Sequence, residues 1–138
     1  MFKTLMGGLK KGKITNLKPM DLDWKKDKKG VLRKFSQFSL AEASIFDWHG
    51  LDEFGYVFYP KQCADGSVVC KLHIHFHGCT GTMLSSSNGY NYMMKYGFNE
   101  YAISNNIIIV FPQARFNLIY NQNDCWDFYG YSSILNPN

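Results

Sequence analysis

The pattern of apolar positions predicts three short strands. Residues Phe54–Pro60 are rich in aromatic and β-branched side chains and stop at a proline, as strands often do. Residues 71–76 form a second such run. Residues Ile107–Phe111 are apolar at every position and are followed by Pro112. A run that is apolar on both faces indicates a strand covered by helices on both sides of a parallel sheet.

A helix is predicted between the second and third strands. Residues 90–105 have helical character in two pieces, which Gly97 separates. In the second piece Phe98, Tyr101 and Ala102 are spaced i, i+3 and i+4, which marks one inner face. Strand, helix and strand over residues 71–111 make a right-handed βαβ unit. The turn after its first strand then lies at the carboxyl edge, where ligands of open α/β sheets bind.

Length and composition allow one domain with a single core. The chain has 138 residues, of which 46% are hydrophobic and 17% aromatic. We expect residues 35–138 to form the folded domain. Residues 1–34 are expected to be a basic N-terminal segment, in which the spacing of Phe2, Leu5, Met6 and Leu9 allows one short helix.

Charge and hydropathy exclude some classes of partner. Residues 1–34 hold 11 Lys and Arg against 3 Asp and Glu, whereas the remainder holds 4 against 8. The basic run at residues 25–30 has no interleaved aromatic side chains and is typical of a solvated loop, so no nucleic-acid partner is predicted. No apolar run approaches the roughly 20 residues of a membrane helix, so no membrane partner is predicted either. The first ten residues lack the apolar core of a signal peptide, and a secretory signal would lie outside this sequence.

Four cysteines, Cys63, Cys70, Cys79 and Cys125, fit neither a zinc ribbon nor a Cys-x-x-Cys redox site. Two disulfides are one interpretation. Cys63 and Cys70 flank a polar turn that can bring them together, and the remaining pair would be Cys79 with Cys125. Four reduced thiols in a cytosolic protein are the alternative. We favour the disulfides.

The turn His77-Gly78-Cys79, after the second predicted strand, carries the clearest chemical signal. In α/β hydrolases a His-Gly turn at this place helps to build the oxyanion hole. There a backbone N–H stabilises the oxygen that becomes negative when an ester carbonyl is attacked. Such an enzyme also needs a serine, a histidine and an acid.

No convincing triad accompanies this turn in the sequence. Residues 130–134 approach the Gly-x-Ser-x-Gly pattern, but they lack the second glycine and do not follow a buried strand. Three serines at residues 85–87 are interpreted as a helix-capping loop. His49 is interpreted as a surface or packed imidazole, because no nucleophile is in sight.

Alternating histidines offer an interpretation from another class of protein. On a strand, His73, His75 and His77 would emerge from one face, a spacing that suits zinc. Against a metal site, His77 is explained by the His-Gly turn and no second ligand motif accompanies the cluster. We therefore predict no metal and no other cofactor, and a zinc protein stays the less favoured alternative.

Several motifs stand in a fixed order, at residues 55–63, 70–79, 89–91, 99–114 and 123–131. Together they resemble the polyhydroxybutyrate (PHB) depolymerase family of esterases. The resemblance covers residues 50–131 well and extends more weakly back through residues 30–38. His75 is a departure, because family members usually carry a smaller or apolar residue there.

The resemblance implies a fold and a set of roles. The fold would be a partial α/β-hydrolase-type three-layer sandwich with a mostly parallel sheet. In the circularly permuted form of the family, the serine, the acid and the histidine precede the segment at residue 55, so the chain would be the C-terminal part. The roles carried over are an oxyanion donor in the backbone N–H of Cys79, a Cys79–Cys125 disulfide, and a substrate-binding wall of His77, Gly78 and Trp126. Trp126 fits core packing equally well.

The expected function is that of an incomplete serine ester hydrolase. When complete, it would act on short-chain hydroxyalkanoate polyesters or related esters; alone, the chain is expected to be inactive. The family and the cysteines imply an extracellular location, and the missing N-terminal half of the enzyme would be a partner. A non-catalytic binding module from the same fold is the alternative. In either case, Ile107–Phe111 or its neighbour would be an unpaired apolar edge.

Overall fold

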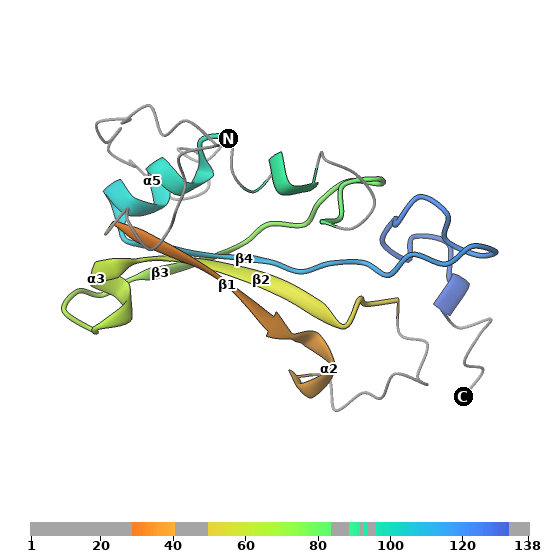
Figure 1. Cartoon of the computed structure of the whole chain (residues 1–138), viewed down its shortest axis with the longest axis horizontal. Coiled ribbons are helices and arrows are strands. Elements are labelled where there is room, and N and C mark those ends of the chain that lie inside the picture. The colour runs from red at the N-terminus through yellow and green to blue at the C-terminus, as the bar shows by residue number, and fades with distance from the viewer. Residues whose placement is uncertain (1–28, 41–49, 84–88, 92, 94–95, 133–138) are drawn as a thin grey trace.

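The computed structural model describes residues 29–40, 50–83, 89–91, 93 and 96–132. Its centre is a four-stranded sheet in the order β1-β2-β4-β3 (Figure 1). The strands are β1 (Gly30–Ser36), β2 (Phe54–Pro60), β3 (Lys71–Ile74) and β4 (Ile107–Phe111). The helices are α2 (Gln37–Leu40), α3 (Lys61–Ala64) and α5 (Phe98–Asn105), and residues 89–91 are also helical.

Most of the predicted elements are present. The strands predicted at Phe54–Pro60 and Ile107–Phe111 are confirmed as β2 and β4, and the strand predicted at residues 71–76 is observed in shorter form as β3. The interruption at Gly97 is confirmed as well. This residue has φ 78° at the N-cap of α5, a conformation that glycine adopts without steric cost. The short helix predicted within residues 1–34 lies outside the described residues.

The sheet is mixed and mostly antiparallel, so the prediction of a mostly parallel sheet was wrong. β3 and β4 do pair in parallel, with His73 opposite Ile109, as the βαβ unit requires. β2, however, pairs antiparallel with both β1 and β4. The apolar run of β4 correctly indicated an interior strand. Such a run does not report the direction of the neighbouring strands. Only one face of β4 is buried, since Ile107, Ile109 and Phe111 are buried whereas Ile108 and Val110 are half-buried.

β1 is a strand that the apolar pattern did not reveal. Its sequence, GVLRKFS, carries two adjacent basic side chains and continues a basic segment. It nevertheless pairs along its whole length with β2, from Gly30 opposite Pro60 to Ser36 opposite Phe54. Gly30 allows the ring of Phe58 to approach, because a Cβ atom here would lie 2.4 Å from the Phe58 Cζ. β1 crosses residue 34, where the basic segment was expected to end, and that division of the chain stays a prediction.

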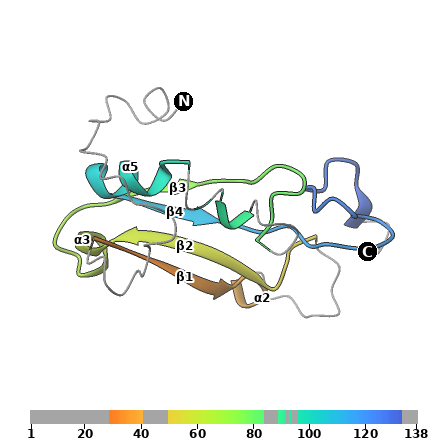
Figure 2. The same cartoon turned by 45° about the horizontal axis from the view of Figure 1, so that its top comes forward.

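The core lies between the sheet and α5. Phe58, Ile107 and Ile109 are fully buried, and Ala102 of α5 packs in the same cluster. Figure 2 shows α5 lying over β3 and β4. Phe98 also packs against the core, whereas Tyr101 is half-buried. The inner face predicted for this helix is therefore largely correct.

The other face of the sheet carries an apolar groove of about 330 Å³. Side chains from β1, β3 and β4, from α2 and from neighbouring loops line it: Phe35, Gln37, Leu51, Ile74, Phe76, Val110 and Pro112. Ile74 is 48% exposed, and Leu72 and Phe76 are each 60% exposed. β3 is also an edge strand of this sheet. The expected unpaired apolar edge therefore belongs to β3, the neighbour of Ile107–Phe111.

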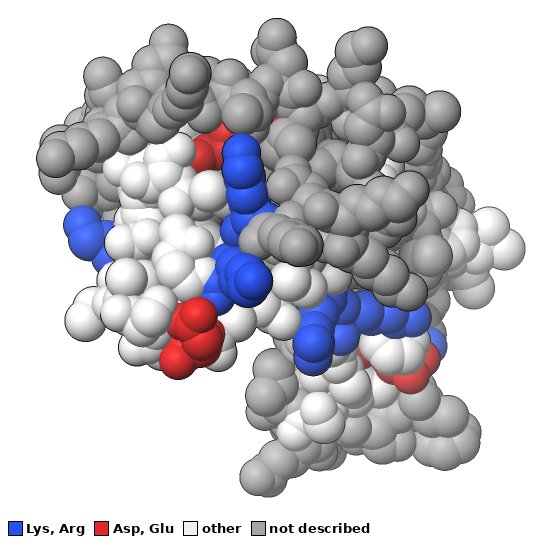
Figure 3. Space-filling model, turned by 60° about the vertical axis from the view of Figure 1, so that its left-hand side comes forward, with Lys and Arg blue, Asp and Glu red and all other residues white. Residues whose placement is uncertain are grey.

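Charged side chains do not form one continuous patch on the face shown in Figure 3. In the described part of that face, basic groups stand apart, acidic groups lie beside some of them, and uncharged residues form most of the surface. Within the described ranges, no helix combines the length and the hydropathy that crossing a bilayer requires.

Candidate active site

The turn that follows β3 forms the candidate site. The backbone N–H of His75 still donates to the Val110 carbonyl of β4, at 2.8 Å, so the chain stays attached to the sheet up to this residue. His77 then turns inward and is only 5% exposed, whereas Gly78 and Cys79 are exposed. The His-Gly turn therefore lies where β3 ends, at the carboxyl edge of the parallel pair.

His77 connects this turn to the segment after β4. Its Nε2 accepts the backbone N–H of Ala114 at 3.0 Å, and its Nδ1 lies 2.7 Å from the Gly78 carbonyl oxygen. Burial lowers the pKa of His77, although the hydrogen bond to Gly78 and the charge of Asp124 oppose this shift. The imidazole is therefore neutral near pH 7.

The Gly78 carbonyl accepts a second hydrogen bond, from the backbone N–H of Gly81 at 3.1 Å. Position 81 requires a glycine, because a Cβ atom there would lie 2.8 Å from the Gly78 oxygen. By contrast, no described heavy atom lies within 4 Å of the place that a Cβ would take at Gly78. The turn is thus packed on its inner side and open on its outer side.

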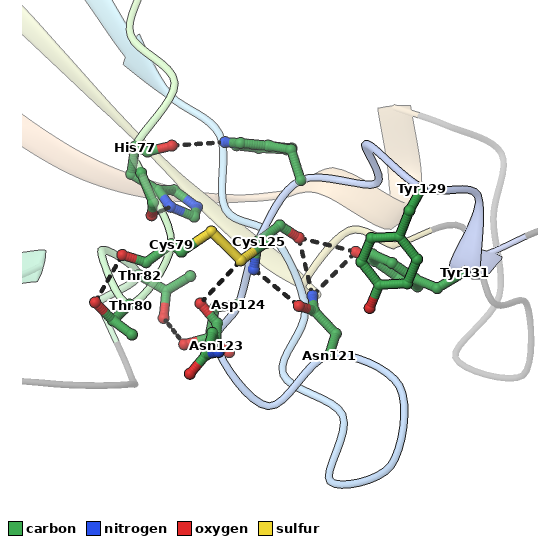
Figure 4. Close-up of a disulfide and its surroundings, with 12 residues drawn as sticks. His77, Cys79, Thr80, Thr82, Asn121, Asn123, Asp124, Cys125, Tyr129 and Tyr131 are labelled. Atoms are coloured by element: carbon green, nitrogen blue, oxygen red, sulfur yellow. Dashed lines mark hydrogen bonds between the residues drawn. A yellow bond between two sulfur atoms is a disulfide. The ribbon is translucent and has the colours of Figure 1, made fainter.

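Disulfide bonds confirm both of the proposed cysteine pairs. Cys79 is bonded to Cys125, with 4.2 Å between their Cα atoms (Figure 4). Cys63 is bonded to Cys70 around the polar turn after α3. The first bond joins the His-Gly turn to a loop 46 residues further along the chain, so the two segments form one structural unit.

Asn121 holds Cys125 in place through hydrogen bonds. This role of Asn121 was not predicted from the sequence. Its side chain donates to the carbonyls of Arg115 and Cys125, at 2.8 and 2.9 Å, and accepts the Cys125 N–H at 2.8 Å. The hydroxyl of Tyr131 lies 3.0 Å from both the Asn121 amide nitrogen and the Cys125 carbonyl (Figure 4). One asparagine in a polar segment gives no signal that separates this buried role from a solvated loop position.

Asp124 adds a buried carboxylate beside the turn. The residue is fully buried and has φ 48°, a left-handed conformation that aspartate tolerates better than most residues. Thr82 donates its hydroxyl to the Asp124 Oδ2 at 2.9 Å (Figure 4). The Thr80 N–H also donates to the Asn123 carbonyl, at 2.5 Å. Hydrogen bonds therefore reinforce the contact that the disulfide makes.

Trp126 packs on the same turn. Its indole N–H donates to the His77 carbonyl oxygen at 2.8 Å. Its ring centroid lies 4.9 Å from that of His77 and 5.1 Å from that of Phe76. The side chain is half-buried. Trp126 therefore packs against the turn and also presents part of its surface to solvent, and its role in lining a substrate cleft stays a prediction.

The rings of His73, on β3, and of His75, just after this strand, take part in aromatic packing. The rings of His73 and His75 lie 6.3 Å apart between centroids, and His75 contacts Phe98 at 4.5 Å and Phe111 at 5.7 Å. Burial lowers the pKa of both His73 and His75. In the part of the chain that the structure describes, no group of three His, Cys, Asp or Glu side chains could hold a metal ion.

Ser132, the serine of the incomplete Gly-x-Ser motif, makes local hydrogen bonds. Its hydroxyl and its backbone N–H both donate to the carboxylate of Asp127, which also accepts the Tyr131 N–H. Slight desolvation raises the pKa of Asp127, but the hydrogen bonds from Ser132, Tyr131 and Gly130 together lower it. This arrangement caps the helical turn at residues 131–132. The other candidates, residues 85–87 and His49, lie outside the described residues.

Two curated proteins are similar in sequence to the chain, while no family model matches it. The chain is 35% identical over 106 residues to the polyhydroxybutyrate depolymerase of Talaromyces funiculosus, which covers 70% of this chain and 31% of that protein. It is 35% identical over 86 residues to the poly(3-hydroxybutyrate) depolymerase of Delftia acidovorans, which covers 62% of this chain and 16% of that protein. The chain thus spans less than a third of the length of each of these relatives.

Solved structures agree with the sequence comparison. The crystal structure of the PHB depolymerase from Penicillium funiculosum is similar with a TM-score of 0.68 and 29% identity, over 96% of this chain and 40% of that one. A PHB depolymerase complexed with an R3HB trimer gives a TM-score of 0.67, with the same identity and coverage. The chain therefore belongs to the polyhydroxybutyrate depolymerase family and corresponds to a part of such a protein.

Proposed function

We propose that this chain supplies the oxyanion site and one wall of the substrate cleft of a serine ester hydrolase. The observation that carries the proposal is the exposed peptide between Gly78 and Cys79. Its carbonyl accepts hydrogen bonds from inside the turn, whereas no described residue accepts the N–H of Cys79. A backbone N–H held in this way, at the carboxyl end of a strand, is suited to bind a developing negative charge.

The nucleophile, the acid and the histidine would come from a further polypeptide segment. A serine would attack the ester carbonyl while a histidine takes up its proton. The N–H of Cys79, with one further N–H, would stabilise the oxyanion. Trp126, fixed on the His77 carbonyl, would line the cleft beside it.

The proposed substrate is a short-chain hydroxyalkanoate polyester or a related ester. Both curated relatives are named as depolymerases of such a polymer, and one solved relative is complexed with an R3HB trimer. The proposed location is extracellular. Two disulfides support it, because such bonds persist in oxidising compartments and are rare in the cytosol.

The apolar face of the sheet supports a missing partner segment. Leu72, Ile74 and Phe76 of this face are all about half exposed or more, and β3 leaves one edge open. Exposed apolar patches of this kind usually mark a surface that another polypeptide covers. The partner we propose is the N-terminal half of the circularly permuted enzyme, which would cover this face and bring the triad to the turn.

A non-catalytic binding module is the second candidate. It is favoured by Ser132, which donates hydrogen bonds to the Asp127 carboxylate and so has a local structural role instead of a catalytic one. Two measurements on the purified 138-residue protein address both candidates. We expect no hydrolysis of a short-chain activated ester above buffer and no label from a serine-directed fluorophosphonate. Stoichiometric labelling would contradict a missing nucleophile. A titration with the R3HB trimer separates the candidates, because saturable binding by this chain alone is expected only of a binding module.

A further inference from the structure

The hydrogen bonds of His77 define which of its ring nitrogens carries the proton. A backbone N–H can only donate, so the Nε2 atom that faces Ala114 must carry a lone pair. The neutral ring therefore has its proton on Nδ1. That proton points to the Gly78 carbonyl oxygen, 2.7 Å away. His77 thus accepts on one side and donates on the other.

This donor fixes the orientation of the peptide between Gly78 and Cys79. In a trans peptide the C=O and N–H groups point in opposite directions, and the described residues contain no cis peptide. The carbonyl is held by His77 Nδ1 and by the Gly81 N–H. The N–H of Cys79 must therefore face away from His77, toward the open side of the turn.

The orientation needs such support because the turn itself is permissive. Gly78 has no side chain to restrict its backbone, and no described heavy atom stands where its Cβ would be. Without His77, this peptide could rotate and turn its carbonyl outward. An oxyanion donor stabilises charge effectively only when it is oriented before the reaction.

We propose that His77 is a positioning residue, which holds the Gly78–Cys79 peptide with the Cys79 N–H toward the substrate and does not contact the substrate itself. The catalytic meaning of this role rests on the proposed function, whereas the orientation rests on the hydrogen bonds alone. The role differs from the substrate contact expected from the family resemblance. His77 is only 5% exposed and its ring packs at a tilt against Trp126, so it offers little surface to a ligand.

Protonation would remove the acceptor on Nε2 while the donor on Nδ1 remains. A charged ring carries a hydrogen on Nε2 as well, and that hydrogen would face the Ala114 N–H. The ionisable groups that act on His77 and its surroundings are Asp124, whose charge favours protonation, and His75, which interacts with His77 through space. The position that the ring takes between Ala114 and Gly78 therefore requires the neutral imidazole.

Nitrogen-15 NMR of the full chain tests the proposal without any need for activity. We expect His77 in the neutral form with its proton on Nδ1, and a Cys79 amide resonance that moves with the protonation of His77. Signals for an Nε2–H tautomer would overturn the proposal. So would a Cys79 amide resonance that does not shift while His77 titrates. His73→Leu serves as the control, because it removes a histidine that lies on β3, outside the turn that His77 forms.

Variants at position 77 give an independent measurement. His77→Leu removes the donor to Gly78, so hydrogen exchange of the Gly81 amide should become about tenfold faster, as loss of one hydrogen bond implies. His77→Asn keeps a donor near the Nδ1 position and should restore part of the protection. Equal Gly81 exchange in the wild type and His77→Leu would contradict the proposal. If these results agree with the proposal but the complete enzyme proves inactive, the proposed function fails and the orienting role of His77 stands.

Discussion

The side-chain amide of Gln37 pairs with the backbone of Gln113 much as a neighbouring strand would. Its Nε2 donates to the Gln113 carbonyl and its Oε1 accepts the Gln113 N–H, each at 3.0 Å, although the residues are 76 positions apart. Both side chains are buried. The pair fastens the end of β1 to the segment after β4, which leads directly to Ala114 and its contact with His77.

Removal of this pair should destabilise the fold. We expect Gln37→Ala to lower the free energy of unfolding by about 1 to 3 kcal/mol, because it leaves the buried Gln113 N–H without its acceptor. The Gln113 carbonyl keeps the backbone N–H of Asp52 as a donor, at 2.9 Å. Urea denaturation of the oxidised protein measures the change. Gln122→Ala is the matched control, since that side chain makes one exposed hydrogen bond to Leu118 and should change stability by less than about 0.5 kcal/mol. Similar values for the two variants would refute the role assigned to Gln37.

The two disulfides should differ in their effect on stability. The Cys79–Cys125 bond closes a loop of 46 residues, and the Cys63–Cys70 bond closes one of 7. Loop-closure entropy then predicts stabilisation by about 4 kcal/mol for the first bond and about 2 kcal/mol for the second. Denaturation of the two double serine variants, one for each bond, checks the order. A larger loss for the Cys63 and Cys70 pair would contradict it.

Acidification should weaken the fold through its buried histidines. Burial lowers the pKa of His73, His75 and His77 below 6.5. Below that value the unfolded chain takes up protons that the folded chain resists, so stability falls as the pH decreases from about 7 toward 5. His75→Gln removes one of these groups and should make the dependence shallower. An unchanged slope in thermal melts across this pH range would argue against buried neutral histidines.

The open edge and apolar face of β3 should make the isolated chain self-associate. A lysine on this strand would oppose such contacts by charge and by solvation. We therefore expect Ile74→Lys to shift the protein toward the monomer in sedimentation velocity. Val69→Lys is a suitable control, because Val69 is 94% exposed and does not line the groove. A wild-type chain that is monomeric at high concentration would contradict the prediction that this face of β3 drives self-association.

Local sequence signals predicted the elements whose sequences are continuously apolar or aromatic. β2 and β4 have continuous apolar or aromatic runs, and Gly97 marks a true break before α5. β1 was missed because only Gly30 of this strand is buried and because the exposed Arg33 and Lys34 continue a basic segment. The strand directions were not predicted correctly either, because the apolar character of β4 is the same beside a parallel or an antiparallel neighbour.

The candidate site shows a similar division. The ordered motifs led to the His-Gly turn, to the Cys79–Cys125 disulfide and to Trp126, which the structure brings together although they are far apart in the sequence. Asn121 and Gln113 were missed because their roles arise from tertiary contacts. An amide that binds buried backbone groups has the same local sequence context as an amide that is solvated.

The oxyanion role of Cys79 is tested most directly in a chimera. In it, this chain replaces the matching region of the Talaromyces funiculosus depolymerase. We expect the chimera to hydrolyse the R3HB trimer. Cys79→Pro removes the N–H and the disulfide, whereas Cys79→Ser removes only the disulfide. Loss of the donor predicts a kcat for Cys79→Pro about 100- to 1,000-fold below that of Cys79→Ser. A folded chimera in which both variants have the same kcat, or which never hydrolyses the ester, would contradict the account.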